Sequence, residues 1–152
     1  MSGIAKDGLA RWHGIVGKMT DETLDAMLAD NVVFHSPVVH TPQEGKALTK
    51  LYLMAAFNVM PGDAAASAPN DAPASLSKPG SKFRYVREVV GDRDAILEFV
   101  TEIDGITVNG VDMIRWNEAG LIEDFKVMIR PLKAIQTIHA QMGRMLEAMK
   151  PG

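Results

Sequence analysis

The stretch "ITVNGVDMIRW", residues 106 to 116, decides the fold. It is rich in β-branched and aromatic residues, which is typical of a β-strand. Side chains alternate between the two faces of a strand, so Val108, Ile114 and Trp116 share a face with Asp112. That face is otherwise apolar. The surrounding sequence therefore has to explain a carboxyl group at Asp112.

The neighbouring stretches predict consecutive antiparallel hairpins. The turn signals "GDR", "DG" and "NEAG" separate four expected strands, at residues 82–90, 94–103, 106–116 and 121–130. Pairing through these turns puts other residues on the face of Asp112: Leu97, Phe99, Thr101, Ile103, Leu121, Glu123, Phe125, Val127 and Ile129. The opposite face is more polar, so Asp112 is predicted to face the interior. Asn109-Gly110 is a second turn signal, and a bulge there would reverse the two faces.

Helical patterns stand before and after these strands. Helices are expected over residues 4–18, 19–30, 42–60 and about 131–149, with Thr20 as a cap and a short strand at 31–39. Residues 61–80, rich in Ala, Pro and Ser, predict a long loop within a single domain spanning 1–152. The fold class expected is α+β. In it the N-terminal helices pack on the concave face of a curved antiparallel sheet and enclose a pocket, and a C-terminal helix packs on the sheet.

Composition excludes several classes of protein. A net charge of -3 gives no basic surface for nucleic acid, and no apolar run approaches a membrane span. The N-terminus has no targeting pattern, so a cytoplasmic location is expected. The chain has no cysteine, and no metal-ligand cluster or phosphate-binding loop stands out. We therefore expect neither a metal nor any other cofactor.

An ionised carboxylate in an apolar interior has to be paired, hydrogen-bonded or kept neutral by a raised pKa. Two interpretations of Asp112 remain open. In the first, the carboxyl group is satisfied structurally by a Trp indole N–H, a backbone amide or an arginine such as Arg87. In the second, Asp112 is an acid at the wall of a binding pocket.

Two local patterns carry a resemblance to a known family. The opening "ARWHGIVGKMTDETLDAMLADNVVFHSP" and the later "VDMIRWNEAGLI" resemble the nuclear transport factor 2-like superfamily, in the branch of ketosteroid isomerases and SnoaL-like polyketide cyclases. "FHSPV" and "VMIRPLKAI" are most similar to uncharacterised SnoaL-like proteins. The resemblance covers most of the chain. It implies a cone-shaped α+β barrel around an apolar pocket, often in a homodimer formed through the outer face of the sheet.

The resemblance carries over to site residues only in part. Asp112 falls where the isomerases keep a protonated aspartic acid that donates a hydrogen bond to the developing oxyanion. Their second donor, a tyrosine, falls on Trp12. Their general base falls on Ser36, which cannot abstract a carbon-bound proton unaided. Steroid isomerisation by that mechanism is therefore not expected.

His35 is the best remaining candidate for a base. It stands beside Ser36, and a His-Asp pair with Asp112 could move a proton in an aldol-type cyclisation, dehydration or isomerisation. Strict alternation places His35 outward if Phe34 and Ser36 face inward, so a structural role for His35 is the alternative.

The expected ligand is a small, largely apolar molecule. The residues expected to bind it are Trp12, Ser36, Arg87, Phe99, Trp116 and Phe125, and packing in the core is the alternative for the four aromatic residues. The first functional hypothesis is a cofactor-free SnoaL-like cyclase, isomerase or dehydratase, with Asp112 and His35 as catalytic residues. The second is a non-catalytic ligand-binding or dimeric accessory domain.

Overall fold

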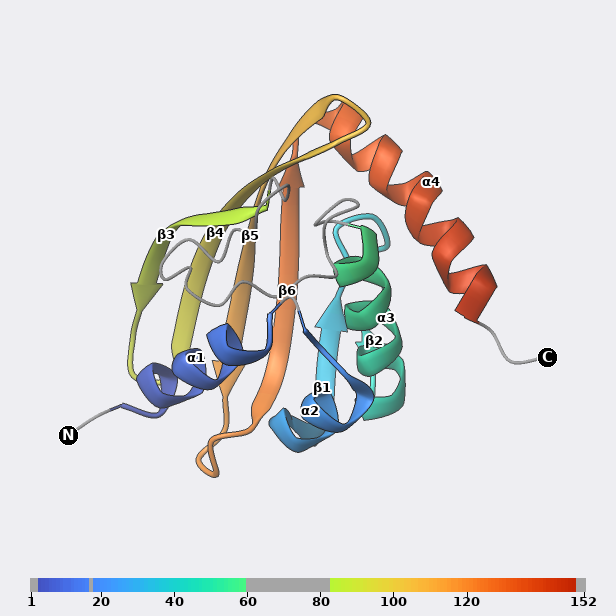
Figure 1. Cartoon of the computed structure of the whole chain (residues 1–152). Helices are drawn as coiled ribbons and strands as arrows, with labels where there is room; N and C mark the ends of the chain where they lie inside the picture. The colour runs from blue at the N-terminus through green and yellow to red at the C-terminus, as the bar shows by residue number, and fades with distance from the viewer. Residues whose placement is uncertain (1–2, 17, 60–82, 150–152) are drawn as a thin grey trace.

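The computed structural model describes residues 3–16, 18–59 and 83–149 (Figure 1). Within these ranges the elements in chain order are α1 (Ile4–Ile15), α2 (Asp21–Met27), β1 (Leu28–His35), β2 (Gln43–Glu44), α3 (Lys46–Val59), β3 (Arg84–Val90), β4 (Asp94–Ile103), β5 (Ile106–Trp116), β6 (Ile122–Arg130) and α4 (Leu132–Met149). The long loop predicted at 61–80 falls outside the described residues.

The strands form one curved, unclosed sheet in the order β2-β1-β6-β5-β4-β3. Figure 1 shows α1 and α2 in front of this sheet, α3 beside β1, and α4 diverging from the end of β6. The predicted α+β cone is confirmed, with one correction. β1 pairs with β6 in parallel, so the sheet is mixed rather than antiparallel throughout. No turn joins these two strands, and the long chain between them permits a parallel pair.

The register of β4 and β5 is the predicted one. Asp104 and Gly105 both have positive φ, at 53° and 78°, as a tight two-residue hairpin turn requires. The turn places Asp112 opposite Leu97. On the other side, Asp112 is opposite Val127 of β6. Asp112 therefore occupies a central strand and faces inward, as the sequence predicts.

The hairpin of β5 and β6 differs from the prediction near its turn. A register shift after Arg115 pairs Trp116 with Ile122, which is fully buried. Leu121 and Glu123, predicted to face inward, therefore do not share the buried face there. Glu123 instead accepts a hydrogen bond from Arg93 at 3.4 Å. The irregularity lies beside the turn, so the inward direction of Phe125 and Val127 is as predicted.

The N-terminal helices are shorter than predicted. Thr20 caps α2 as expected, because its hydroxyl oxygen accepts a hydrogen bond from the Thr23 backbone N–H at 3.1 Å. The helix ends at Met27, and Leu28 already belongs to β1. Before α3, residues 43–44 pair with β1 as an edge strand instead of extending the helix. Gly45, with a φ of 103°, makes the change of direction between the two.

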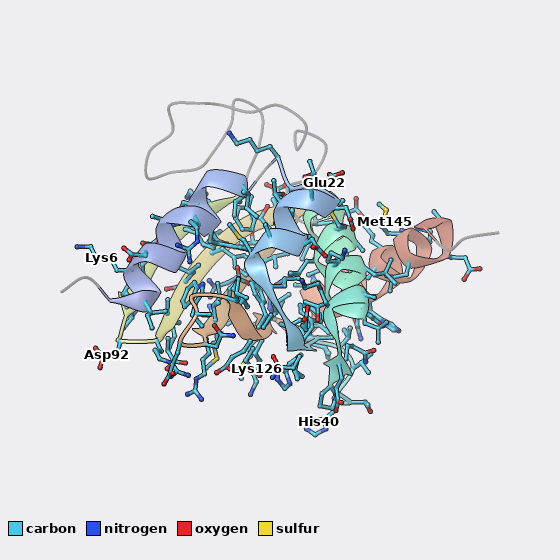
Figure 2. The ribbon with its side chains drawn as sticks, turned by 90° about the horizontal axis from the view of Figure 1, so that it is seen from below. Lys6, Glu22, His40, Asp92, Lys126 and Met145 are labelled. Carbon is cyan, nitrogen blue, oxygen red and sulfur yellow. The ribbon has the colours of Figure 1, made fainter. Side chains whose placement is uncertain are left out.

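The core lies between the helices and the concave face of the sheet. Its largest fully buried side chains are aromatic: Trp12, Phe34, Phe99, Trp116 and Phe125. The other face of the sheet is the outer face, where Figure 2 shows Lys126 on the side away from α1 and α2. α1 packs very closely on Trp116, because a Cβ atom at Gly8 would lie 2.2 Å from the indole nitrogen.

Candidate functional site

Asp112 is the buried acid of the candidate site. Only 3% of its surface is exposed. The Tyr85 hydroxyl donates a hydrogen bond to Asp112 Oδ2 at 2.8 Å. Arg87 does not pair with Asp112. Its Nε atom donates instead to Glu98 Oε1 at 3.0 Å, and 73% of the Arg87 side chain is exposed. A neutral hydroxyl group, rather than a cation, thus contacts Asp112.

Burial raises the pKa of Asp112 from 3.8 to about 7, and the hydrogen bond from Tyr85 opposes this rise. Burial and the nearby Asp112 charge raise the pKa of Tyr85 well above its usual value of 10, so the phenol stays protonated near neutrality. Below about pH 7, Asp112 is therefore a neutral carboxylic acid next to a permanent hydrogen-bond donor.

Tyr85 is itself held by Trp12. The Trp12 indole N–H donates to the Tyr85 hydroxyl oxygen at 3.1 Å. The family resemblance predicts Trp12 near Asp112, but Tyr85, which lies between them, was not predicted. A signal for Tyr85 existed, because β3 pairs Tyr85 with Phe99, which the alternation already assigned to the face of Asp112.

Asp112 borders a small apolar cavity of about 30 Å³. The volume is room for one or two water molecules. Its lining includes Phe34, Ser36, Leu53, Phe83, Phe99, Asp112, Phe125, Val127, Ile138 and Met142. Of the predicted binding residues, Ser36, Phe99 and Phe125 line this cavity. Trp12, Trp116 and Arg87 do not line it.

Ser36 and Asp112 are the polar side chains in this described lining. The Ser36 hydroxyl oxygen accepts a hydrogen bond from the Val38 backbone N–H at 3.1 Å, which leaves its own proton available for donation. The cavity thus offers a carboxyl group and a hydroxyl group to a ligand that is otherwise surrounded by hydrocarbon.

His35 does not lie with Asp112. Its Nε2 atom is 2.9 Å from Asp124 Oδ1, and Asp124 belongs to the outer face of the sheet. Phe34 and Ser36 both line the cavity, so alternation turns His35 to the other side. The His35–Asp112 pair considered from the sequence is not formed, and the geometry favours a structural hydrogen bond between His35 and Asp124.

The described residues contain no cluster of three or more His, Asp or Glu side chains placed to hold a metal ion. No helix in those same ranges has the length and apolar character that a membrane span requires.

No family model and no curated protein matches the sequence. Among solved structures, the chain is similar to a steroid delta-isomerase from Pseudomonas aeruginosa, with 28% identity, a TM-score of 0.78, and coverage of 97% of this chain and 95% of that one. It is also similar to an uncharacterised protein with a cystatin-like fold from Silicibacter pomeroyi DSS-3, with 28% identity, a TM-score of 0.73, and coverage of 90% and 83%.

The epoxide hydrolase/cyclase-like enzyme SalBIII shares the fold, at 15% identity and a TM-score of 0.57, with coverage of 83% of this chain and 90% of that one. These neighbours, the cone fold and the inward-facing acid define one class of protein. The chain belongs to the nuclear transport factor 2-like superfamily, which includes the SnoaL-like proteins. Its neighbours in that superfamily are isomerase-like and cyclase-like proteins.

Proposed function

We propose that the protein binds a small, largely apolar carbonyl compound in the cavity and acts on it as an isomerase, cyclase or dehydratase. The observation that carries this proposal is the neutral Asp112 acid at the wall of an apolar cavity. A buried acid of this kind donates a hydrogen bond to a carbonyl oxygen and stabilises the negative charge that develops there during enolisation, while a water molecule from the solvent takes the proton lost from the α-carbon. The similarity to a steroid delta-isomerase supports the same class of chemistry.

The cavity sets the size of the substrate. A volume of about 30 Å³ admits a carbonyl compound only when the lining side chains move apart. Met142 in this lining has a flexible thioether side chain, which suits such repacking. The proposed substrate is therefore compact, with a single polar group that reaches Asp112.

Activity is testable without knowledge of the natural substrate, because enolisation exchanges the α-protons of a ketone with solvent. We expect the wild-type protein to accelerate deuterium exchange at the α-carbons of cyclic ketones, measured by NMR in heavy water. Asp112→Asn removes the acid and should lower the exchange rate by about 100-fold or more. The rate should also fall as pH rises through about 7, because the acid ionises.

Asp94→Asn is the matched control for this experiment. Asp94 is also a strand carboxyl group, but it pairs with Arg115 at 2.9 Å on the outer face, and its replacement should leave exchange unchanged. Equal rates for wild type and Asp112→Asn across the ketone panel would remove Asp112 from the chemistry.

A non-catalytic ligand-binding role is the second candidate. It is favoured by Ser36, because this serine stands where the isomerases have their general base and lacks the strength to replace it. In that case ketones should perturb the NMR signal of the Asp112 carboxyl group, with no acceleration of exchange.

We also propose a homodimer through the outer face of the sheet. Three large apolar side chains on that face are exposed, namely Val89 at 55%, Ile96 at 37% and Met128 at 50%. Val89 is opposite Ile96 in neighbouring strands, so two of them form one apolar strip. Burial of such a strip against a second copy would stabilise a dimer through the hydrophobic effect.

Charge on the outer face of the sheet should separate the two copies. We expect the double variant Val89→Lys with Met128→Lys to sediment as a monomer, while wild type sediments as a dimer. Leu132→Lys is the control, because Leu132 is 67% exposed at the start of α4, away from the strip, and its variant should remain dimeric. Unchanged sedimentation of the double variant would contradict this interface.

A further inference from the structure

The Trp12, Tyr85 and Asp112 side chains form a continuous chain of hydrogen bonds through the core. They come from α1, β3 and β5, and their exposed fractions are 0%, 8% and 3%. The Trp12 indole nitrogen is 3.1 Å from the Tyr85 hydroxyl oxygen, which is 2.8 Å from Asp112 Oδ2. Neither Trp12 nor Tyr85 lines the cavity, so their hydrogen bonds act on a ligand through Asp112.

The direction of each hydrogen bond follows from which of the two groups can donate. An indole N–H is a donor only, so the Tyr85 oxygen is the acceptor in the first hydrogen bond. The phenol has a single proton, and it uses that proton to donate a hydrogen bond to Asp112 Oδ2. Oδ2 is thereby an acceptor. When the carboxyl group is neutral, its own proton is best placed on the other oxygen, Oδ1.

Oδ1 has no hydrogen-bond partner in the described part of the chain, and Asp112 borders the cavity. We infer that Trp12 and Tyr85 are positioning residues that hold the Asp112 proton on the oxygen available to the cavity, so that the site selects ligands presenting a hydrogen-bond acceptor. This inference rests on the proposed function, because it says which oxygen of the same Asp112 acid carries the proton.

The ligand class follows from that direction. A ketone, aldehyde or ether oxygen accepts a hydrogen bond from the protonated Oδ1. An alcohol of the same shape can also accept, but its own O–H then needs an acceptor. The other polar side chain in the described lining is Ser36, and its hydroxyl oxygen already accepts a hydrogen bond from the Val38 backbone N–H. The inference therefore predicts that the site prefers a ketone to the matched alcohol.

The coupling along the chain is testable in the free protein. The hydrogen bond from Tyr85 lowers the pKa of Asp112, so Tyr85→Phe should raise that pKa above its value of about 7. Trp12→Phe should raise it by a smaller amount, because a tyrosine that accepts no hydrogen bond is a weaker donor. Carboxyl-selective NMR gives these pKa values, with Asp112→Asn to assign the signal.

Trp116→Phe is the matched control. Trp116 is as deeply buried as Trp12, yet its indole is placed against Gly8 rather than Tyr85. Its replacement removes the same bulk and should leave the pKa of Asp112 unchanged. Equal shifts for Trp12→Phe and Trp116→Phe would overturn the positioning role. Replacement of Tyr85 by 3-fluorotyrosine keeps the packing, strengthens the donor and should lower the pKa of Asp112.

A ligand experiment then tests the preference itself. Cyclohexanone and cyclohexanol have the same ring and differ in their polar group, and their binding is measured at a pH below 7 from the Asp112 carboxyl signal. We expect wild type to bind the ketone at least about fivefold more tightly, the value of one net hydrogen bond, and Tyr85→Phe to lose most of this preference. Equal binding of the two probes to wild type would overturn the inferred selection.

Different results would contradict the proposed function and the positioning role of Trp12 and Tyr85. If the pKa values shift as expected but neither probe binds, the positioning role of Trp12 and Tyr85 holds and the ligand site fails. If the ketone binds and exchanges its protons while Trp12→Phe leaves the pKa of Asp112 unchanged, the proposed function holds and the positioning role of Trp12 is wrong.

Discussion

Between about pH 4 and pH 7 the wild-type protein should lose about 4 kcal/mol of its free energy of unfolding relative to Asp112→Asn. The pKa of Asp112 is about 7 in the folded protein and 3.8 as the reference value for the unfolded chain. In this window the folded state binds more protons than the unfolded state, so stability falls as pH rises. The slope is about 1.4 kcal/mol per pH unit, and the loss levels off above pH 7.

Urea unfolding of both proteins at a series of pH values measures this difference. Other titrating groups act alike in the two proteins, so the comparison isolates Asp112. A difference in stability that stays constant with pH would mean that the folded pKa of Asp112 is near 3.8. Asp112 would then be ionised at neutral pH, and both its role as an acid and the selection of acceptor ligands would be lost.

Gly8→Ala should destabilise the protein by about 3 kcal/mol. Alanine in the middle of a helix is normally more stable than glycine by about 0.5 to 1 kcal/mol. Here the new Cβ atom would lie 2.2 Å from the indole nitrogen of Trp116, a buried ring that has little room to move. α1 would have to move away from the sheet, and overpacking of this kind costs about 1 to 3 kcal/mol or more.

Gly14→Ala in the same helix is the control. No atom lies within 4 Å of a Cβ added at Gly14, so this variant should gain up to about 1 kcal/mol. The two variants are compared by urea unfolding at one pH. If Gly8→Ala gained stability as Gly14→Ala does, the close packing of α1 on Trp116 would be wrong.

The sequence predicts the orientation of Asp112 because that orientation depends on local rules. Strand alternation and the Asp104-Gly105 turn fix which residues oppose each other in β4 and β5, and the structure agrees. Alternation also predicts that His35 turns away when Phe34 and Ser36 face inward. These predictions need only neighbours in the chain or across one tight hairpin.

Features that join distant segments were not predictable in this way. The parallel pairing of β1 with β6 depends on how the whole sheet assembles. Tyr85 meets Trp12 across 73 positions in the chain, and no local pattern indicates that contact. The shift between Arg115 and Trp116 depends on how the following turn packs, so the sequence placed Glu123 on the wrong face.

The cavity wall includes Ile138 and Met142. Both belong to α4, which follows all the strands in the chain. The exclusion of water from Asp112 therefore depends on α4 as well as on β5, the strand that carries Asp112. Movement of α4 away from the sheet would admit water to the carboxyl group and return its pKa towards 3.8. At a pH between these values each such opening would release a proton, so a motion of α4 would be coupled to proton exchange with the solvent.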